Sequence, residues 1–146
     1  MPKGIYSLII MLENDQYIEI GKLGTYFFKK GYYVYNGSAL GGFGRVKYHL
    51  KNNKNKRWHI DYFLDKSKII KIITSEVKKN YEHDISKSLA SKNDAEIPVM
   101  KFGSSDCNKG CPSHFVYFKK IPELGPIYES LGLKFVIFEE TDFKNM

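Results

Sequence analysis

The sequence predicts a single domain of the α/β class, and three observations support that prediction. Residues 4–11 alternate between two faces that are both mostly apolar, as is typical of a central strand that is covered on both sides. Residues 31–35 also alternate with a period of two, whereas the apolar residues from position 43 onward recur with helical spacing. The chain has 146 residues and contains no repeat, linker or low-complexity block, so we expect residues 1–146 to fold as one domain.

Four strands are expected before the first helix. In chain order they cover residues 4–11, 17–21, 25–29 and the segment that begins at 31. Tyr33 and Tyr35 share one face of the fourth strand, because residues two apart in a strand point the same way. We expect Asn36, Gly37 and Ser38 to end this strand, since these residue types favour turns.

A helix is expected from Phe43, because Phe43, Val46 and Leu50 fall on one side of it. Arg45 and His49 are four residues apart and therefore lie together on a different stripe. A cation beside an imidazole suits an anionic substrate. The same pair is equally compatible with an ordinary solvated face of a helix.

The second half of the chain has weaker patterns. Residues 51–57 are basic and rich in asparagine, which indicates either a solvated loop or a segment that lies against a phosphate backbone. The elements expected after them are a strand at 69–73, a helix at 81–90, a strand at 113–118, a helix at 123–131 and a strand at 135–138 before a polar tail. Glu82 lies at the edge of the apolar stripe of the helix 81–90, a place from which a carboxylate can face a cleft.

Charge and composition restrict the class of partner. The formal net charge of +7 and the aromatic content of 15% favour a polyanion, with nucleic acid ahead of an anionic membrane surface. Solubility alone is the plainer explanation of so many lysines. We expect a cytoplasmic protein, because no targeting segment is visible and the apolar run 5–12 is too short to span a bilayer.

Two triplets and their spacing resemble a known family, the GIY-YIG nucleases. Gly4-Ile5-Tyr6 matches the first triplet and Tyr35-Asn36-Gly37 the second, with Arg45 ten residues after Tyr35 and His49 four residues further on. The strings RWHIDYFL (57–64) and FGSSDC-x3-C-x2-H (102–114) look like a branch filed as a domain of unknown function in archaea and bacteria. Some members of that branch are fused to DNA glycosylases of the endonuclease III type. The resemblance covers roughly residues 1–118, and it implies a small, mainly antiparallel sheet flanked by helices, here with an added C-terminal extension.

The resemblance also implies a set of catalytic residues, namely Tyr6, Tyr35, Arg45, His49 and Glu82. In this interpretation Glu82 holds one divalent cation, Mg²⁺ or Mn²⁺, and Arg45 clamps a phosphate oxygen. The tyrosines orient or deprotonate the attacking water, and His49 carries a proton or donates to phosphate. Asn36 departs from the usual aliphatic centre of the second triplet. Glu76 and Asp84 compete with Glu82 for the metal, and the late asparagine of the family has only Asn93 as a candidate.

Contacts to nucleic acid are expected from basic residues after the second triplet, namely Lys47, Lys51, Arg57 and His59. Packing beside Trp58 or pairing with Asp61 explains His59 equally well. Cys107, Cys111 and His114 supply three ligands of the kind that zinc prefers, and Asp106 or a remote histidine would be needed as the fourth. Two small buried thiols are the favoured reading of the cysteines.

The function expected from this combination is a metal-dependent endonuclease that hydrolyses phosphodiester bonds in DNA, with a structure-specific or repair-related role. A nucleic-acid-binding module that has lost turnover is the alternative, with DNA again preferred over RNA. A third hypothesis is a zinc-stabilised accessory domain of a repair enzyme, with a DNA glycosylase or another repair protein as its partner. No sequence feature indicates the oligomeric state.

Overall fold

The computed structural model describes residues 4–39, 44–50, 59–77, 81–92, 94–98 and 114–144. Their centre is a five-stranded sheet in the order β6-β4-β1-β5-β7, in which every neighbouring pair of strands is antiparallel. The strands are β1 (Gly4–Leu12), β4 (Gly31–Ala39), β5 (Lys68–Glu76), β6 (Phe115–Phe118) and β7 (Val136–Glu139). The predicted α/β (α+β) fold with a mainly antiparallel sheet is therefore confirmed.

β1 is the central strand, as its sequence predicts. Tyr6, Leu8 and Ile10 join one hydrophobic cluster, whereas Ile5 and Ile9 join a second cluster on the other face. All five side chains are buried. A strand covered on both sides loses its alternation of apolar and polar residues, which is the pattern of residues 4–11.

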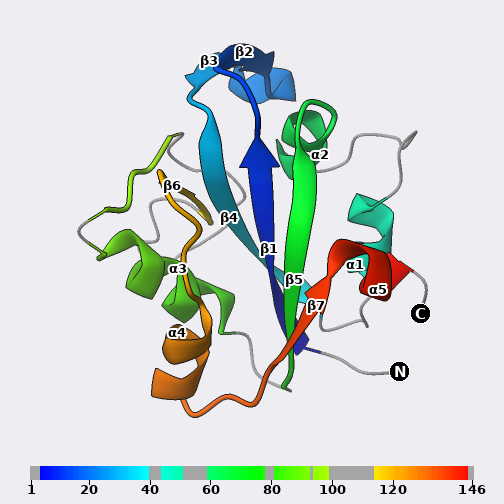
Figure 1. The fold of residues 1–146 in the computed structure, drawn as a ribbon, viewed down its shortest axis with the longest axis vertical. Helices are drawn as coiled ribbons and strands as arrows, with labels where there is room; N and C mark the ends of the chain where they lie inside the picture. The colour runs from blue at the N-terminus through cyan, green and yellow to red at the C-terminus, as the bar shows by residue number, and fades with distance from the viewer. Residues whose placement is uncertain are drawn as a thin grey trace.

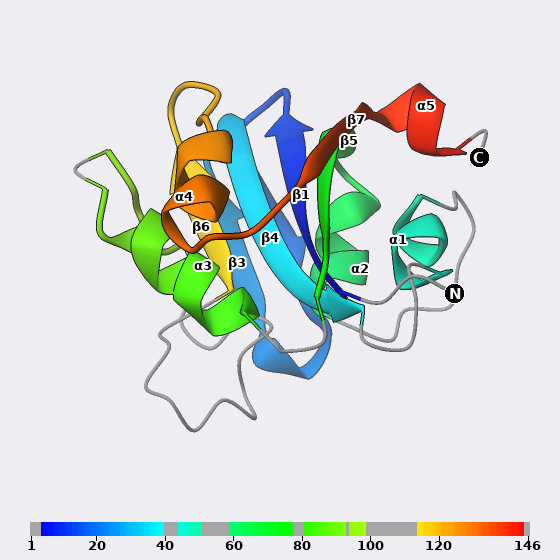
Figure 2. The same ribbon diagram turned by 90° about the horizontal axis from the view of Figure 1, so that it is seen from below.

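Different elements cover the two faces of the sheet (Figures 1 and 2). The Tyr6 face is covered by the hairpin β2 (Gln16–Glu19) and β3 (Thr25–Phe28), whose short 3₁₀ turn spans Gly21–Leu23, and by helices α1 (Gly44–His49) and α2 (His59–Leu64). The Ile5 face is covered by α3 (Glu82–Ala90) and α4 (Gly125–Ser130). Apolar side chains from all of these elements enter the two clusters, which therefore hold both layers to the sheet.

The structure corrects one expectation from the sequence and adds two helices. β4 continues to Ala39, so Asn36, Gly37 and Ser38 do not end the strand but pair with Ser7, Tyr6 and Ile5 of β1. Long-range pairing has overridden the local preference of these residues for turns. Residues 59–64, which were not assigned to an element, form α2, and the polar tail contains a further helix, α5 (Glu140–Lys144).

None of the helices in the described segments has the length and apolar character that crossing a bilayer requires. The exposed apolar side chains among the described residues lie mainly on the β2–β3 hairpin and on β7. Tyr6 and Tyr35, two of the residues that the resemblance implies for catalysis, are buried on the Tyr6 face, so the candidate site lies there.

Candidate active site

Two tyrosines from neighbouring strands meet on this face. Tyr6 lies opposite Gly37 in the register of β1 and β4, and Tyr35 lies two residues along, opposite Leu8. Their ring centroids are 6.5 Å apart. A Cβ atom at Gly37 would lie 2.4 Å from Cζ and the hydroxyl oxygen of Tyr6. The glycine of the second triplet thus makes room for the phenol of the first.

His49 joins the tyrosines from the last residue of α1. Its Nε2 lies 2.9 Å from the Tyr6 hydroxyl, and its ring centroid lies 6.1 Å from that of Tyr35. The side chain is 2% exposed, because Val46 and Leu50 anchor α1 in the same cluster. His49 therefore lies inside the site and not on a solvated helix face.

Asp61 completes the group from α2. Its Oδ1 lies 3.4 Å from Nδ1 of His49, and its carboxylate is fully buried. This distance is long for an N–H···O hydrogen bond, so the contact with Tyr6 is the tighter of the two. A carboxylate facing Nδ1 favours the tautomer with the proton on that nitrogen, and in that tautomer Nε2 is the acceptor of the Tyr6 hydroxyl. The described residues thus hold a carboxylate, an imidazole and a phenol in line.

Asp61 was not among the residues that the sequence predicts for the site. One signal was available: a carboxylate sits between Ile60 and Phe63, which are both buried in the cluster. An acidic residue is rarely buried without a partner, so Asp61 in an apolar helix indicates a buried cation or donor nearby.

The remaining predicted catalytic residues have described backbones only. Arg45 belongs to α1, one turn before His49, and Glu82 is the first residue of α3. The buried apolar side chains of α3, Ile85 and Leu89, pack on the Ile5 face, opposite the tyrosines. The competing carboxylates Glu76 and Asp84 are exposed. The assignments of Arg45 and Glu82 stay predictions.

The expected nucleic-acid and zinc residues fall mostly outside the described residues. The structure does not describe the nucleic-acid candidates Lys51 and Arg57 or the zinc candidates Cys107 and Cys111, and Lys47 contributes only backbone to α1. Asn93, the candidate for the late asparagine of the family, is also not described. His114 is buried at the start of β6 and its carbonyl accepts the Asn36 N–H at 3.0 Å.

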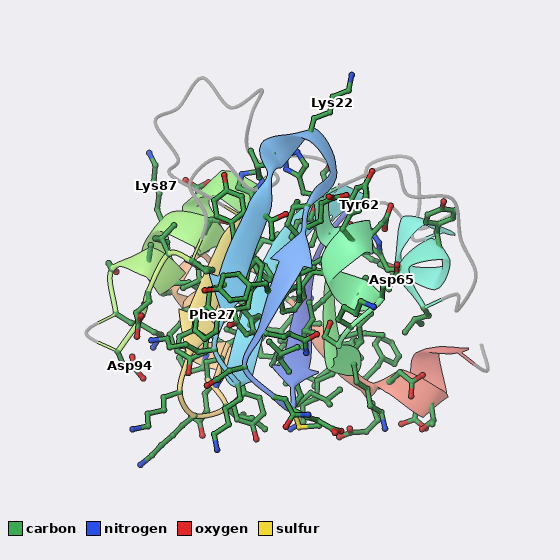
Figure 3. The ribbon with its side chains drawn as sticks, turned by 90° about the horizontal axis from the view of Figure 1, so that it is seen from above. Lys22, Phe27, Tyr62, Asp65, Lys87 and Asp94 are labelled. Carbon is green, nitrogen blue, oxygen red and sulfur yellow. The ribbon has the colours of Figure 1, made fainter. Side chains whose placement is uncertain are left out.

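His59 is the first residue of α2, and burial lowers its pKa. It would therefore offer DNA a neutral hydrogen-bonding group at pH 7 and not a charge. Figure 3 shows the neighbouring Tyr62 on the same helix, close to the turn of the β2–β3 hairpin.

Among the described residues, no group of three or more His, Cys, Asp and Glu side chains could hold an ion. Asp61 is the buried carboxylate that the described side chains place at the tyrosines, and it already faces His49. A carboxylate, an imidazole and a phenol in this order are a suitable arrangement for proton transfer from the phenol.

One family comparison matches most of the chain. The family described as "Domain of unknown function DUF123" matches residues 5–134, a range that contains Tyr6, Tyr35, His49 and Asp61 and ends before β7. No curated protein and no solved structure matches the chain.

Proposed function

This chain belongs to the DUF123 family of domains, and we propose that it is a metal-dependent endonuclease that cleaves phosphodiester bonds in DNA. The observation that carries the proposal is the line from Asp61 through His49 to the Tyr6 hydroxyl, with Tyr35 beside it. Three residues that the GIY-YIG resemblance names for catalysis therefore share one buried cluster. A buried phenol needs one hydrogen-bond partner for its hydroxyl, which His49 supplies, but it does not need a carboxylate behind that partner.

The geometry supports a general-base role for Tyr6. A phenol has an ordinary pKa of about 10, so it cannot remove a proton from water at neutral pH without help. His49 Nε2 would take the phenolic proton, while Asp61 stabilises the imidazolium through Nδ1–H. The Tyr6 phenolate oxygen would then accept a proton from the water that attacks phosphorus. The new bond joins the water oxygen to phosphorus, and the ester bond to the sugar oxygen breaks. The sugar oxygen leaves as an alkoxide that takes a proton from solvent, and His49 returns its proton to solvent.

Charge on the phosphate needs separate partners. Arg45, one turn before His49 in α1, would bind a non-bridging phosphate oxygen. A divalent cation would neutralise the developing charge, and Mg²⁺ needs only one or two carboxylates because water and substrate phosphate complete its shell. In this proposal that carboxylate is Glu82, the first residue of α3. Because the buried side chains of α3 pack on the opposite face of the sheet, Glu82→Ala tests this part of the proposal separately from His49→Ala.

A cleavage assay on purified protein tests the proposal. Plasmid and branched DNA are incubated with Mg²⁺ or Mn²⁺, and nicking is compared between wild type, His49→Ala, Arg45→Ala and Glu82→Ala. Each variant should lose about a hundredfold or more in rate, since each removes a proton carrier or a charge contact of the transition state. Glu96→Ala, which breaks only the exposed Lys29–Glu96 pair, is the matched control. Equal nicking by all variants would show that another protein cuts the DNA.

A nucleic-acid-binding module without turnover is the second candidate, and burial favours it. Tyr6 is 0% and Tyr35 only 5% exposed, which leaves little phenol surface for a substrate. Such a module would bind DNA in a salt-sensitive manner. It would cleave none of the substrates with any divalent cation.

A further inference from the structure

A continuous line of polar side chains lies on the Ile5 face of the sheet, directly behind the two tyrosines. Ser7 Oγ lies 2.6 Å from Asn36 Oδ1 and 2.6 Å from the Tyr128 hydroxyl. Asn36 Nδ2 donates to Ser86 Oγ at 3.0 Å. The line therefore joins β1, β4, α3 and α4, and we call it the Ser7–Asn36 chain.

The direction of each hydrogen bond in the Ser7–Asn36 chain follows from the donors available. Ser7 has one proton, which it donates to the amide oxygen of Asn36. Tyr128 must then be the donor to Ser7, and burial raises its pKa, so it keeps the proton that this requires. All four side chains are buried, and the cluster around them is apolar. Loss of one member would leave its neighbours without partners in apolar surroundings, which is costly.

The Ser7–Asn36 chain links the two strands that carry the tyrosines, β1 and β4. Ser7 directly follows Tyr6 and Asn36 directly follows Tyr35. Ser7 and Asn36 are also direct partners in the register of β1 and β4. A slip of one residue would turn every side chain to the wrong face, and the Ser7–Asn36 contact exists only in the observed register.

We propose that Ser7 and Asn36 are positioning residues for Tyr6. By fixing the register of β1 on β4, they place the Tyr6 ring over Gly37 and hold its hydroxyl at His49 Nε2. Tyr6 is a catalytic residue only if the proposed function holds, whereas the geometric part of the inference stands without it.

The test compares Ser7→Ala with Ser75→Ala. Ser75 is an equally buried serine on β5, and its hydroxyl donates to the Lys134 carbonyl, on the other side of β1. Nitrogen NMR of histidine-labelled protein reports the state of the His49 ring, whose signals are identified by their loss in His49→Gln. In Ser7→Ala the Nε2 signal should move away from its wild-type position, because the Tyr6 hydroxyl is no longer held. In Ser75→Ala the Nε2 signal should stay, although both variants melt at lower temperature.

The same variants are assayed for cleavage well below their melting temperatures. Ser7→Ala should lower kcat about tenfold to a hundredfold with little change in KM, since a small misplacement of a reacting group has effects of this size. Ser75→Ala should leave both constants close to wild type.

An unchanged His49 spectrum in folded Ser7→Ala would overturn the inference, and so would an equal shift in Ser75→Ala. If Ser7→Ala does not fold, Asn36→Asp and Tyr128→Phe, which preserve shape, are measured in the same way. Asn36→Asp should shift the His49 signal, because a carboxylate cannot donate to Ser86; the absence of a shift overturns the inference. If Ser7→Ala shifts the His49 signal but the wild-type protein cleaves no DNA, the proposed nuclease function is refuted and the positioning role stands.

Discussion

At the scale of single residues, Asp61 decides which nitrogen of His49 can take a proton. In the tautomer that this carboxylate favours, Nδ1–H donates to Asp61 and Nε2 accepts from the Tyr6 hydroxyl. In Asp61→Asn the amide can donate to Nδ1 instead, which moves the ring proton to Nε2 and removes the base. We expect kcat to fall about 10²-fold or more, with KM nearly unchanged, in steady-state cleavage assays.

Asp94→Asn is the matched control for that prediction. Asp94 is exposed and lies on the opposite side of the molecule from α2 (Figure 3). It should retain wild-type kcat and melting temperature. Wild-type cleavage by Asp61→Asn would mean that His49 does not act as a base.

His59 gives a second prediction at this scale, on pH. Burial holds its pKa below the ordinary value of about 6.5, so the unfolded chain takes up a proton more readily than the folded one. This contribution is absent well above pH 6.5, and it lowers stability as the pH falls through 6.5 toward the folded-state pKa. Between pH 7.5 and 5.5, His59→Gln should therefore lose less in melting temperature than wild type. Equal losses in calorimetric scans would contradict the prediction.

At the scale of elements, the junction of β1 and β4 is the least tolerant place in the site. In Gly37→Ala the new Cβ would lie 2.4 Å from Cζ and the hydroxyl oxygen of Tyr6, so the ring must move away from His49. We expect a loss in stability of about 1–3 kcal/mol, as is usual for overpacking, together with the loss of cleavage. Urea unfolding and the nicking assay measure the two effects.

Gly125→Ala is the control for that substitution. Its Cβ would lie 3.2 Å from the tip of the Phe135 ring, so the ring needs to move by only a few tenths of an ångström. Its stability should change by less than that of Gly37→Ala, with cleavage retained. Wild-type stability and cleavage in Gly37→Ala would show that the Tyr6 ring adapts easily.

Local pattern predicts most of these elements but not their contacts. β1 was predictable because the mostly apolar run of residues 4–11 is visible in the sequence itself. Tyr33 and Tyr35 were correctly placed on one face because residues two apart in a strand point the same way. The extent of β4 was not predictable, because Asn36 and Gly37 resemble a turn until their partners in β1 are known. Nor does helical periodicity say which face of a sheet a helix covers, so the position of α3 opposite the tyrosines could not be foreseen. The contact of Asp61 with His49 depends on how α1 and α2 pack, which no spacing encodes.

At the scale of the whole molecule, the site lies between the sheet and a layer of short elements. α1 and α2 have six residues each, too few for an isolated helix to be stable, so they depend on burial of Val46, Ile60 and Phe63. The geometry of His49 and Asp61 is therefore a property of the assembled core. Weakening that core should reduce cleavage before the sheet itself unfolds.

The C-terminal strand and helix are the part of the molecule that this core needs least. The family match ends at residue 134, and Val136 and Ile137 of β7 are 53% and 50% exposed. Among the described strands, β7 pairs only with β5, at the edge of the sheet, although Phe138 packs against the Tyr6 cluster. Deletion of residues 136–146 should therefore leave a cooperatively folded protein that melts several degrees lower and still nicks DNA at a rate close to wild type. Deletion of 140–146, which removes only α5 and the last two residues, should lower the melting temperature less. A circular dichroism melt without a cooperative transition after the longer deletion would show that β7 belongs to the core of this domain.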